Sequence, residues 1–344
     1  IASCGLGESD ALIKDLCVED VEEAGMYGIK FFLNGEWITV VVDDLLPCQR
    51  DPVTGLWDPI FSKPKIHQQQ DEDDYELWPM IFEKAWAKLH LSYEVTDAGF
   101  TADTTNYLTG GTVSTVELKD NEQDADAVGQ WQSLMNFFEL SKAQNSVAFL
   151  SCSVRAEIPV DPSTLMYSWG LVTGHAYSLL GIQQSRYLPH VRLVRIRNPW
   201  GRVEWRGAYH DKDHQAWGEH PSLRREFGMV DEEDGQFFMN FNDFCYFFGQ
   251  VEICDPAAIT RYVEDGATGK CRVDVYEGQW VKGQTAGGHN RVSGNTCFDC
   301  NPTCILTVKK AGDVEIAMYQ PDTRPVMTTT DINLMSIELV LIHP

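Results

Sequence analysis

Two short blocks in the middle of the chain contain side chains that can move protons. The first is Gly-His-Ala-Tyr at 174–177 and the second is Arg-Asn-Pro-Trp-Gly at 197–201. A histidine oriented by an asparagine forms two-thirds of a Cys-His-Asn arrangement for nucleophilic catalysis. His175 and Asn198 are therefore candidate catalytic residues, and a nucleophile has to be sought elsewhere.

The residues between the two blocks predict a β-hairpin that brings His175 and Asn198 together. Residues 178–183 and 191–197 are apolar and β-branched, and the intervening segment 184–190 is polar and contains a proline. A turn centred between positions 186 and 187 pairs residues whose numbers add up to 373, as 175 and 198 do. Directly opposed side chains have Cβ atoms about 4.5–5.5 Å apart, so an amide–imidazole hydrogen bond is within reach. The alternative is an ordinary buried hairpin with a structural histidine at its edge.

The composition sets limits on the class of protein. The 344 residues are 43 % hydrophobic, which supports sizeable cores. The formal net charge of −24 argues against general nucleic-acid binding, which needs basic patches. The sequence has no apolar run long enough for a transmembrane helix, and the Ile1 end has neither an initiator methionine nor a signal-peptide pattern. We therefore expect a cytoplasmic protein and interpret the chain as a fragment or a processed piece.

Ten cysteines are present in a chain too long and core-rich to be a compact disulfide scaffold. Several lie in apolar runs, as Cys152 and Cys245 do, and are interpreted as small buried residues with free thiols. Cys297, Cys300 and Cys304 resemble half of a metal knuckle. Without a second Cys or His pair at ligand spacing, this signal is weak.

The remaining patterns predict a mixed α and β chain. Apolar runs at 28–33 and 37–42 flank Asn-Gly, a strong signal for a tight hairpin. Helical periodicity predicts helices over 77–89 and about 125–142, followed by a strand at 147–150. A domain boundary is expected near 255. Beyond it, strand-like runs at 271–276, 303–309, 314–319 and 337–342 favour a β-sandwich.

These blocks together resemble the calpain family of cysteine endopeptidases. The carriers of the resemblance are Leu-x-x-Gly-His-Ala-Tyr-Ser from 171, Ile-Arg-Asn-Pro-Trp-Gly-x-x-Glu-Trp from 196, Gly-Glu-Trp from 35, Glu-x-Trp from 76, Thr-Gly-Gly from 109, Glu-Asp-Gly from 233 and Gly-x-Trp from 278. The resemblance covers nearly the whole chain. It implies an α+β fold, with a papain-like cysteine protease core at 1–255, mostly its second lobe. An all-β C2-like sandwich at 256–344, incomplete at its end, would follow.

The resemblance also implies where the chemistry lies. His175 would be the general base and Asn198 its orienting residue, while Trp200 would either shield their hydrogen bond or simply fill the core. The family's nucleophilic cysteine falls upstream of Ile1, since residues 1–3 resemble the end of its motif. Cys4 lies well past that position, away from the helix N-terminus that lowers a thiol pKa. This chain alone is therefore predicted to be inactive.

Calcium is the cofactor that the resemblance implies, bound by oxygen ligands on acidic loops. The matching second-lobe positions are Glu204, Asp211, Glu232 through its main-chain oxygen, Asp234 and Gln236, and Glu76 matches a first-lobe ligand. Gln236 stands where the family has glutamate, and the missing charge should weaken the site. The alternative is a solvated acidic turn at 231–236.

Two functions from different classes remain open. The first is a calcium-dependent type of intracellular cysteine endopeptidase that cuts protein substrates at limited sites. The alternative is a non-catalytic calpain-like scaffold that contacts proteins or membranes through its β-sandwich. The residues that precede Ile1 would discriminate between them, because serine or glycine in place of the cysteine would exclude proteolysis. The sequence identifies neither the substrate nor the oligomeric state.

Overall fold

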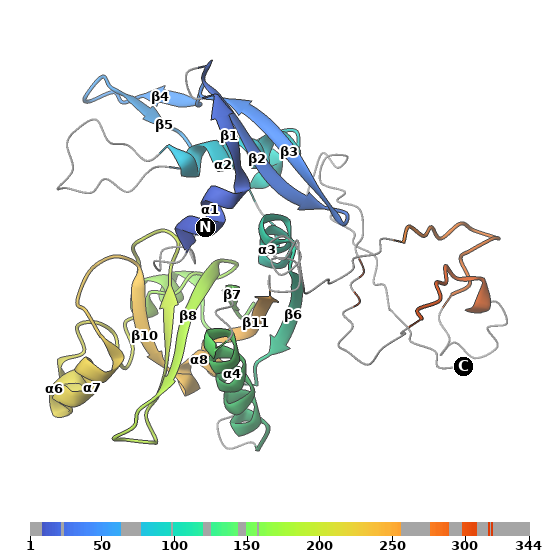
Figure 1. The fold of residues 1–344 in the computed structure, drawn as a ribbon. Coiled ribbons are helices and arrows are strands. Elements are labelled where there is room, and N and C mark those ends of the chain that lie inside the picture. The colour runs from blue at the N-terminus through green and yellow to red at the C-terminus, as the bar shows by residue number, and fades with distance from the viewer. Residues whose placement is uncertain are drawn as a thin grey trace.

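The computed structural model describes residues 9–21, 24–62, 77–97, 99–119, 125–143, 149–156, 158–255, 276–288, 298–307, 316 and 318. Up to residue 255 the elements form two lobes, which lie one above the other in Figure 1 with helix α3 at their junction. Helices and antiparallel sheets occur in both lobes. The predicted α+β core is therefore confirmed.

The first lobe is built on a three-stranded antiparallel sheet of β1 (Cys17–Val21), β2 (Met26–Leu33) and β3 (Glu36–Asp43). Asn34 and Gly35 join β2 to β3 with φ angles of 51° and 88°. Positive φ at both positions is the type I′ turn that matches the twist of the strands. The predicted hairpin is confirmed, with Leu33 paired to Glu36.

Three helices cover this sheet: α1 (Ser9–Leu16), α2 (Trp78–Leu89) and α3 (Thr101–Thr109). The predicted helix at 77–89 is confirmed as α2, which begins with a proline in its first turn. Its buried face, which includes Ile81, Phe82 and Ala85, packs against Ile29 and Phe31 of β2. The hairpin β4 (Cys48–Arg50) and β5 (Trp57–Pro59) lies beyond β3, and a 3₁₀ turn, η3 (Glu94–Thr96), follows α2.

The second lobe is a six-stranded sheet in the order β10-β9-β8-β7-β11-β6, with every neighbouring pair antiparallel. Its strands are β6 (Thr112–Glu117), β7 (Phe149–Val154), β8 (Ala176–Gln184), β9 (Arg192–Arg197), β10 (Gln236–Asn240) and β11 (Phe248–Asp255). Helices α4 (Ala125–Ala143) and α8 (Phe241–Phe247) pack against it through Trp131, Leu134 and Phe244. The predicted second helix is thus confirmed.

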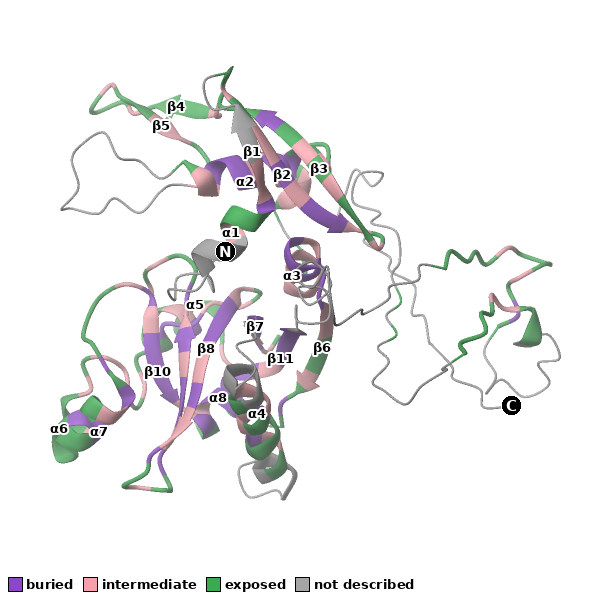
Figure 2. Ribbon diagram, in the orientation of Figure 1, coloured by how far each residue is buried: buried purple, intermediate pink, exposed green. Residues whose placement is uncertain are grey.

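Short elements complete the second lobe. They are α5 (Pro162–Thr164), the π-helical turn η4 (Leu165–Trp169), α6 (His214–Glu219) and α7 (Pro221–Phe227). Burial follows the strands of the sheet, while α6 and much of α7 face solvent (Figure 2). Among the described residues, no helix is long and apolar enough to cross a membrane.

The β8–β9 hairpin forms as predicted, but its register differs. Ser178 pairs with Arg197 and Leu179 with Ile196, so paired numbers add up to 375 near the open end instead of 373. The register shifts again between Leu179 and Gly181. Such an irregularity inserts one unmatched residue, which a prediction from loop symmetry cannot locate.

The expected β-sandwich lies largely outside the described residues. The runs expected at 271–276, 314–319 and 337–342 fall almost entirely there. Of the described part, residues 276–288 contain a turn and Phe298–Cys300 form the 3₁₀ turn η5. The strand expected from 303 is absent over 303–307, where Ile305 is 93 % exposed and no described strand supplies a pairing edge. The domain boundary near 255 and the sandwich stay predictions.

Candidate active site

His175 and Asn198 flank the open end of the β8–β9 hairpin, where they form a direct hydrogen bond. His175 immediately precedes β8 and Asn198 immediately follows β9. The distance from His175 Nε2 to Asn198 Oδ1 is 2.9 Å. The amide oxygen can only accept, so Nε2 carries the proton and Nδ1 is left with its lone pair. The arrangement produces a defined tautomer with one nitrogen ready to take up a proton.

The orientation of the Asn198 amide is fixed by contacts on both of its sides. The backbone N–H of Trp200 donates to Oδ1 at 3.1 Å, and Nδ2 donates to the carbonyl of Val203 at 2.9 Å. A flipped amide would lose both of these bonds. Asn198 is completely buried, and its own N–H donates to the Gly235 carbonyl at 2.8 Å. The residue that orients the imidazole is therefore held rigidly itself.

Two unusual backbone positions build this support. Val203 has φ of 63°, which is a rare conformation for a β-branched residue, and its carbonyl is the one that accepts from Asn198. Gly235 has φ of 84°, and a Cβ there would lie 2.6 Å from the Asn198 carbonyl oxygen. Glycine adopts this conformation without strain, whereas the strain at Val203 persists only where the surrounding structure enforces it, and such strain clusters at functional sites.

Aromatic rings enclose the imidazole. The Trp200 ring centroid lies 4.5 Å from that of His175, and the Tyr177 ring lies 5.0 Å away in an edge-on arrangement. Trp200 is 49 % exposed, so it does not act as core filling, the simpler alternative for it. Tyr177 is buried and its hydroxyl accepts from the N–H of Val172. Burial lowers the pKa of His175, and the bond to Asn198 opposes part of that shift.

None of the described cysteines supplies a nucleophile for this site. Cys152 lies closest in the sheet, since it pairs with Tyr177 across β7 and β8. Complete burial holds the pKa of its thiol well above the usual range, which is the opposite of what a nucleophile needs. No described cysteine hydrogen-bonds to His175, and Cys4 lies outside the described residues.

The second-lobe acidic residues lie near the same hairpin end. Glu204 accepts a hydrogen bond from the Gly235 N–H at 2.8 Å, which joins the loop after β9 to the turn before β10. Burial together with the charges of Glu204 and Asp231 raises the pKa of Asp211 to about 7. Burial likewise raises the pKa of Glu204, which also faces Asp234. These carboxylates repel one another in a half-buried setting.

Gln236 partly fills the space between these acidic groups. Its backbone N–H and its Nε2 both donate to the Asp234 carboxylate, at 2.8 and 2.6 Å, and its Oε1 is buried without a hydrogen-bond partner. Glu232 is exposed, although its N–H contacts Asp211. In the described part of the chain, no three His, Cys, Asp or Glu side chains converge closely enough to hold a metal ion. Glu76 lies outside the described residues.

Sequence reasoning missed Tyr177, Val203 and Gly235 as parts of the site. The only sequence signal for Tyr177 was its position two residues after His175. No local sequence pattern predicts the role of Val203, whose carbonyl accepts from Asn198 because the Val203 backbone has a positive φ. Gly235 could have been suspected, because it follows an acidic pair and precedes a strand, where glycine often supplies a positive φ.

Comparison with known proteins places this chain in a family. The family described as "Calpain family cysteine protease" matches residues 1–255. Human Calpain-9 is 33 % identical over 309 residues, which cover 88 % of this chain and 40 % of the relative. The Calpain-1 catalytic subunit of Bos taurus is 35 % identical over 295 residues, covering 84 % of this chain and 36 % of the relative. The chain thus spans about two fifths of these relatives' length. It belongs to the calpain family of cysteine proteases.

Proposed function

We propose that this chain is the base-bearing part of a cysteine endopeptidase. The observation that carries the proposal is the 2.9 Å bond from His175 Nε2 to the oxygen of a fully buried, doubly anchored Asn198. A structural histidine needs no such fixed tautomer, whereas a general base does. Membership of the calpain family supports the same assignment. The nucleophile is a cysteine thiolate that none of the described cysteines provides.

The reaction uses the free nitrogen of His175. Nδ1 accepts the proton of the nucleophilic thiol, and the thiolate attacks the carbonyl carbon of a peptide bond. The electron pair of the carbonyl moves to oxygen and then returns as the C–N bond breaks. Nδ1 gives its proton to the leaving amine, and water subsequently cleaves the acyl-enzyme with His175 as the base. Asn198 holds the ring in place throughout, because Nε2 remains bonded to Oδ1.

Burial assists the first step. The pKa of His175 lies below its ordinary value because the ring is partly buried, so the imidazole is neutral near pH 7 and can accept a proton. The half-exposed Trp200 ring covers one side of the imidazole and limits the access of water to the His175–Asn198 bond. We propose this shielding as the role of Trp200.

The test compares this chain with a version extended upstream of Ile1 by the coding sequence of its gene. We expect the extended protein to cleave a casein or peptide substrate in a thiol-dependent manner, and to lose cleavage in His175→Ala. The 344-residue chain should neither cleave nor be labelled stoichiometrically by an epoxide directed at active-site thiols. Labelling of Cys4 coupled to peptide turnover would overturn the assignment. Serine or glycine at the nucleophile position would favour the scaffold function.

Calcium fits the chemistry of the acidic loops but not their present geometry, because the carboxylates of Glu204, Asp211 and Asp234 do not converge as a metal site among the described residues. Glu204, Asp211, Asp234, the main-chain oxygen of Glu232 and the buried, unpartnered Oε1 of Gln236 are the groups that would hold it. A bound calcium ion would supply the positive charge that relieves the repulsion among these carboxylates. Gln236 gives the site one negative charge fewer than a glutamate would, and its amide already donates a hydrogen bond to the Asp234 carboxylate. We therefore propose weak calcium binding.

Calorimetry tests the calcium site directly. Asp211→Ala should abolish whatever calcium binding the chain shows, while Glu36→Gln on the first lobe should leave it unchanged. A submicromolar affinity that persists in Asp211→Ala would sink the assigned site. Restoring the charge with Gln236→Glu should strengthen binding, because ligand charge is a main determinant of calcium affinity. Protein substrates and a cytoplasmic location remain proposals that follow from the protease function.

A further inference from the structure

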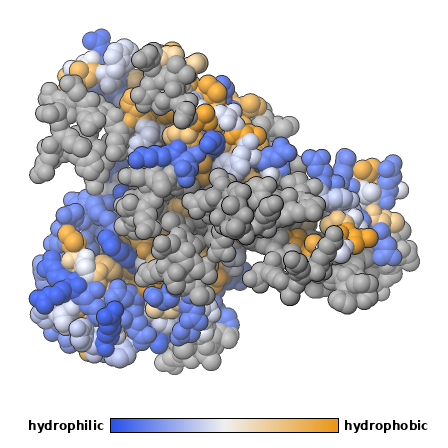
Figure 3. Space-filling view, viewed as in Figure 1, coloured by the Kyte–Doolittle hydropathy of each residue, from blue (hydrophilic) through white to orange (hydrophobic). Residues whose placement is uncertain are grey.

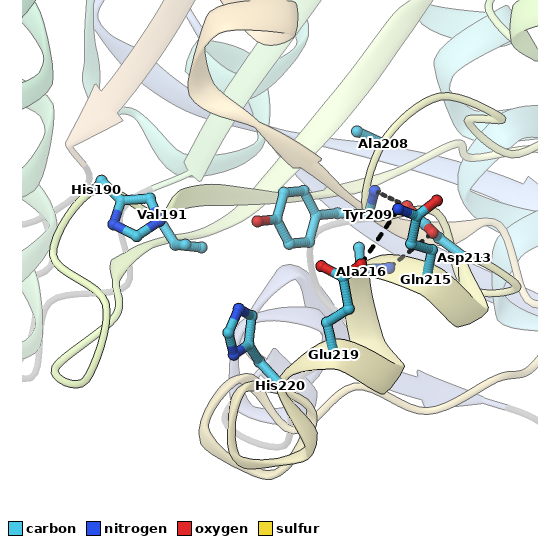
Figure 4. Close-up of a pocket in the computed structure, with 9 residues that line it drawn as sticks. All are labelled: His190, Val191, Ala208, Tyr209, Asp213, Gln215, Ala216, Glu219 and His220. Carbon is cyan, nitrogen blue, oxygen red and sulfur yellow. Dashed lines mark hydrogen bonds between the residues drawn. The ribbon is translucent and has the colours of Figure 1, made fainter.

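A cavity of about 400 Å³ lies on the second lobe, at the end of the β8–β9 hairpin away from His175. Its wall comes from the hairpin loop, the loop before α6 and α6 itself (Figure 4). Val191 and the six residues of β9 separate His190 from Asn198, and the strand alone spans roughly 20 Å. The cavity is thus distinct from the candidate active site.

The lining of the cavity is acidic and aromatic. Asp213 and Glu219 line it together with two histidines and Tyr209, and it contains neither lysine nor arginine. The Asp213 carboxylate accepts two backbone hydrogen bonds, one from the N–H of Ala216 at 3.0 Å and one from the N–H of Tyr209 at 2.9 Å. Glu219 accepts one hydrogen bond, from the Gln215 amide at 3.2 Å, and is exposed.

Tyr209 is held toward the cavity by an unusual backbone. Its φ is 67°, a conformation that bulky residues rarely adopt, and its N–H donates to Asp213 at 2.9 Å. The ring rests edge-on against the buried Trp217, with centroids 5.5 Å apart. In Figure 4 the ring projects between His190 on one side and Glu219 and His220 on the other. The loop therefore presents an aromatic ring next to a carboxylate.

The chemistry of these groups selects the ligand. The imidazoles of His190 and His220 have no hydrogen-bond partner among the described residues, yet no described group of three ligating side chains could hold a metal. A planar cation suits the site better, because it stacks on an aromatic ring and pairs with a carboxylate through a fork of N–H donors. The net charge of −24 also attracts basic partners.

We propose that this cavity binds the guanidinium group of an arginine presented by a basic polypeptide segment. The guanidinium lies against the Tyr209 ring and donates to Glu219, with Asp213 supplying additional negative charge. The imidazoles accept its remaining N–H groups. This binding site does not depend on the proposed protease function, because it needs neither the nucleophile nor His175.

NMR titration of the 344-residue chain with N-acetyl-arginine N-methylamide tests the proposal. We expect saturable shifts of the His190, His220 and Tyr209 ring resonances, with a dissociation constant in the millimolar range. The citrulline analogue has the same shape without the charge and should cause no saturable shift. Tyr209→Ala should weaken binding roughly threefold to tenfold, and Glu219→Gln by up to about fivefold.

Glu36→Gln is the matched control, since it removes the same charge from exposed β3 on the other lobe. Full binding in Glu36→Gln, combined with weakened binding in Glu219→Gln, would support the site. Equally weakened arginine binding in both variants would show that the acidic protein attracts arginine nonspecifically, and this result would overturn the proposal. Equal shifts by arginine and citrulline would also overturn it. Circular dichroism of each variant checks the fold, and Tyr209→Phe, which keeps the ring, should retain most of the binding.

Discussion

Replacement of Asn198 by alanine should both destabilise the second lobe and lower the pKa of His175. The side chain of Asn198 makes three hydrogen bonds of 2.9–3.1 Å, to His175, the Trp200 N–H and the Val203 carbonyl. Each bond contributes about 0.5–1.5 kcal/mol net. Asn198 is fully buried, but its three partners are partly exposed and can regain water. We therefore expect a loss of roughly 2–3 kcal/mol in the free energy of unfolding.

The pKa shift has a sign that tests the geometry itself. Burial lowers the pKa of His175 from 6.5 and the bond to Asn198 raises it, so removing the bond should lower the pKa further. Asn198→Asp is the matched variant, because its carboxylate should raise the pKa instead. NMR titration of the His175 ring proton measures both shifts, and urea unfolding measures stability. An unchanged His175 pKa in both variants would refute the hydrogen bond in solution.

Three further predictions concern stability. The pKa of Asp211 is about 7 in the folded protein against 3.8 for the free side chain, so between these pH values the folded state keeps a proton that the unfolded state has lost. The free energy of unfolding should therefore fall as the pH rises from about 4 to 7, and Asp211→Asn should flatten this decline in urea titrations. Glu252 of β11 is buried, and its carboxylate accepts hydrogen bonds from Thr101 of α3 and Ser151 of β7. Glu252→Ala should lower the free energy of unfolding, measured in urea, by about 1–3 kcal/mol, and Glu252→Gln should lower it less. Gly170 and Gly174 have φ angles of 70° and 62°, but only a Cβ at Gly170 would collide, because it would lie 1.7 Å from the Glu204 carbonyl oxygen. In thermal unfolding, Gly170→Ala should therefore be less stable than Gly174→Ala by about 1–3 kcal/mol.

Local patterns predicted the elements of this fold because local physics determines them. Asn34-Gly35 requires positive φ at both positions, and the stripe of α2 follows from helical periodicity. The hairpin at 176–197 was predicted from two apolar runs and a polar loop. Contacts made by backbone atoms far apart in sequence could not be predicted this way. Gly235, which contacts the Asn198 backbone, and the carboxylate set around Asp211 depend on how loops meet in three dimensions.

The surfaces of the two lobes differ in hydropathy. Figure 3 shows hydrophobic side chains gathered on the face of the first lobe near β2 and β3, whereas the second lobe is mostly hydrophilic in that view. Met26, Trp37 and Val41 of these strands are 46 %, 39 % and 47 % exposed. The second lobe has buried hydrophobic clusters on its six-stranded sheet, although it too exposes some large hydrophobic side chains. The β8–β9 hairpin that carries His175 and Asn198 at its open end thus packs against a buried core of its own lobe.

The register predicted for the β8–β9 hairpin was wrong, yet the contact between His175 and Asn198 was predicted correctly. Side chains alternate between faces with a period of two, so a shift of the pairing sum from 373 to 375 keeps the side chains at the open end of the hairpin on their predicted face. Extending the observed register opposes Tyr177 to Asn198 and His175 to Trp200. All four then share one face, in agreement with the ring contacts of His175 to both aromatic residues. His175 reaches Asn198 as a diagonal neighbour, a distance that long side chains can span. A shift of one residue would have placed the imidazole and the amide on opposite faces of the sheet.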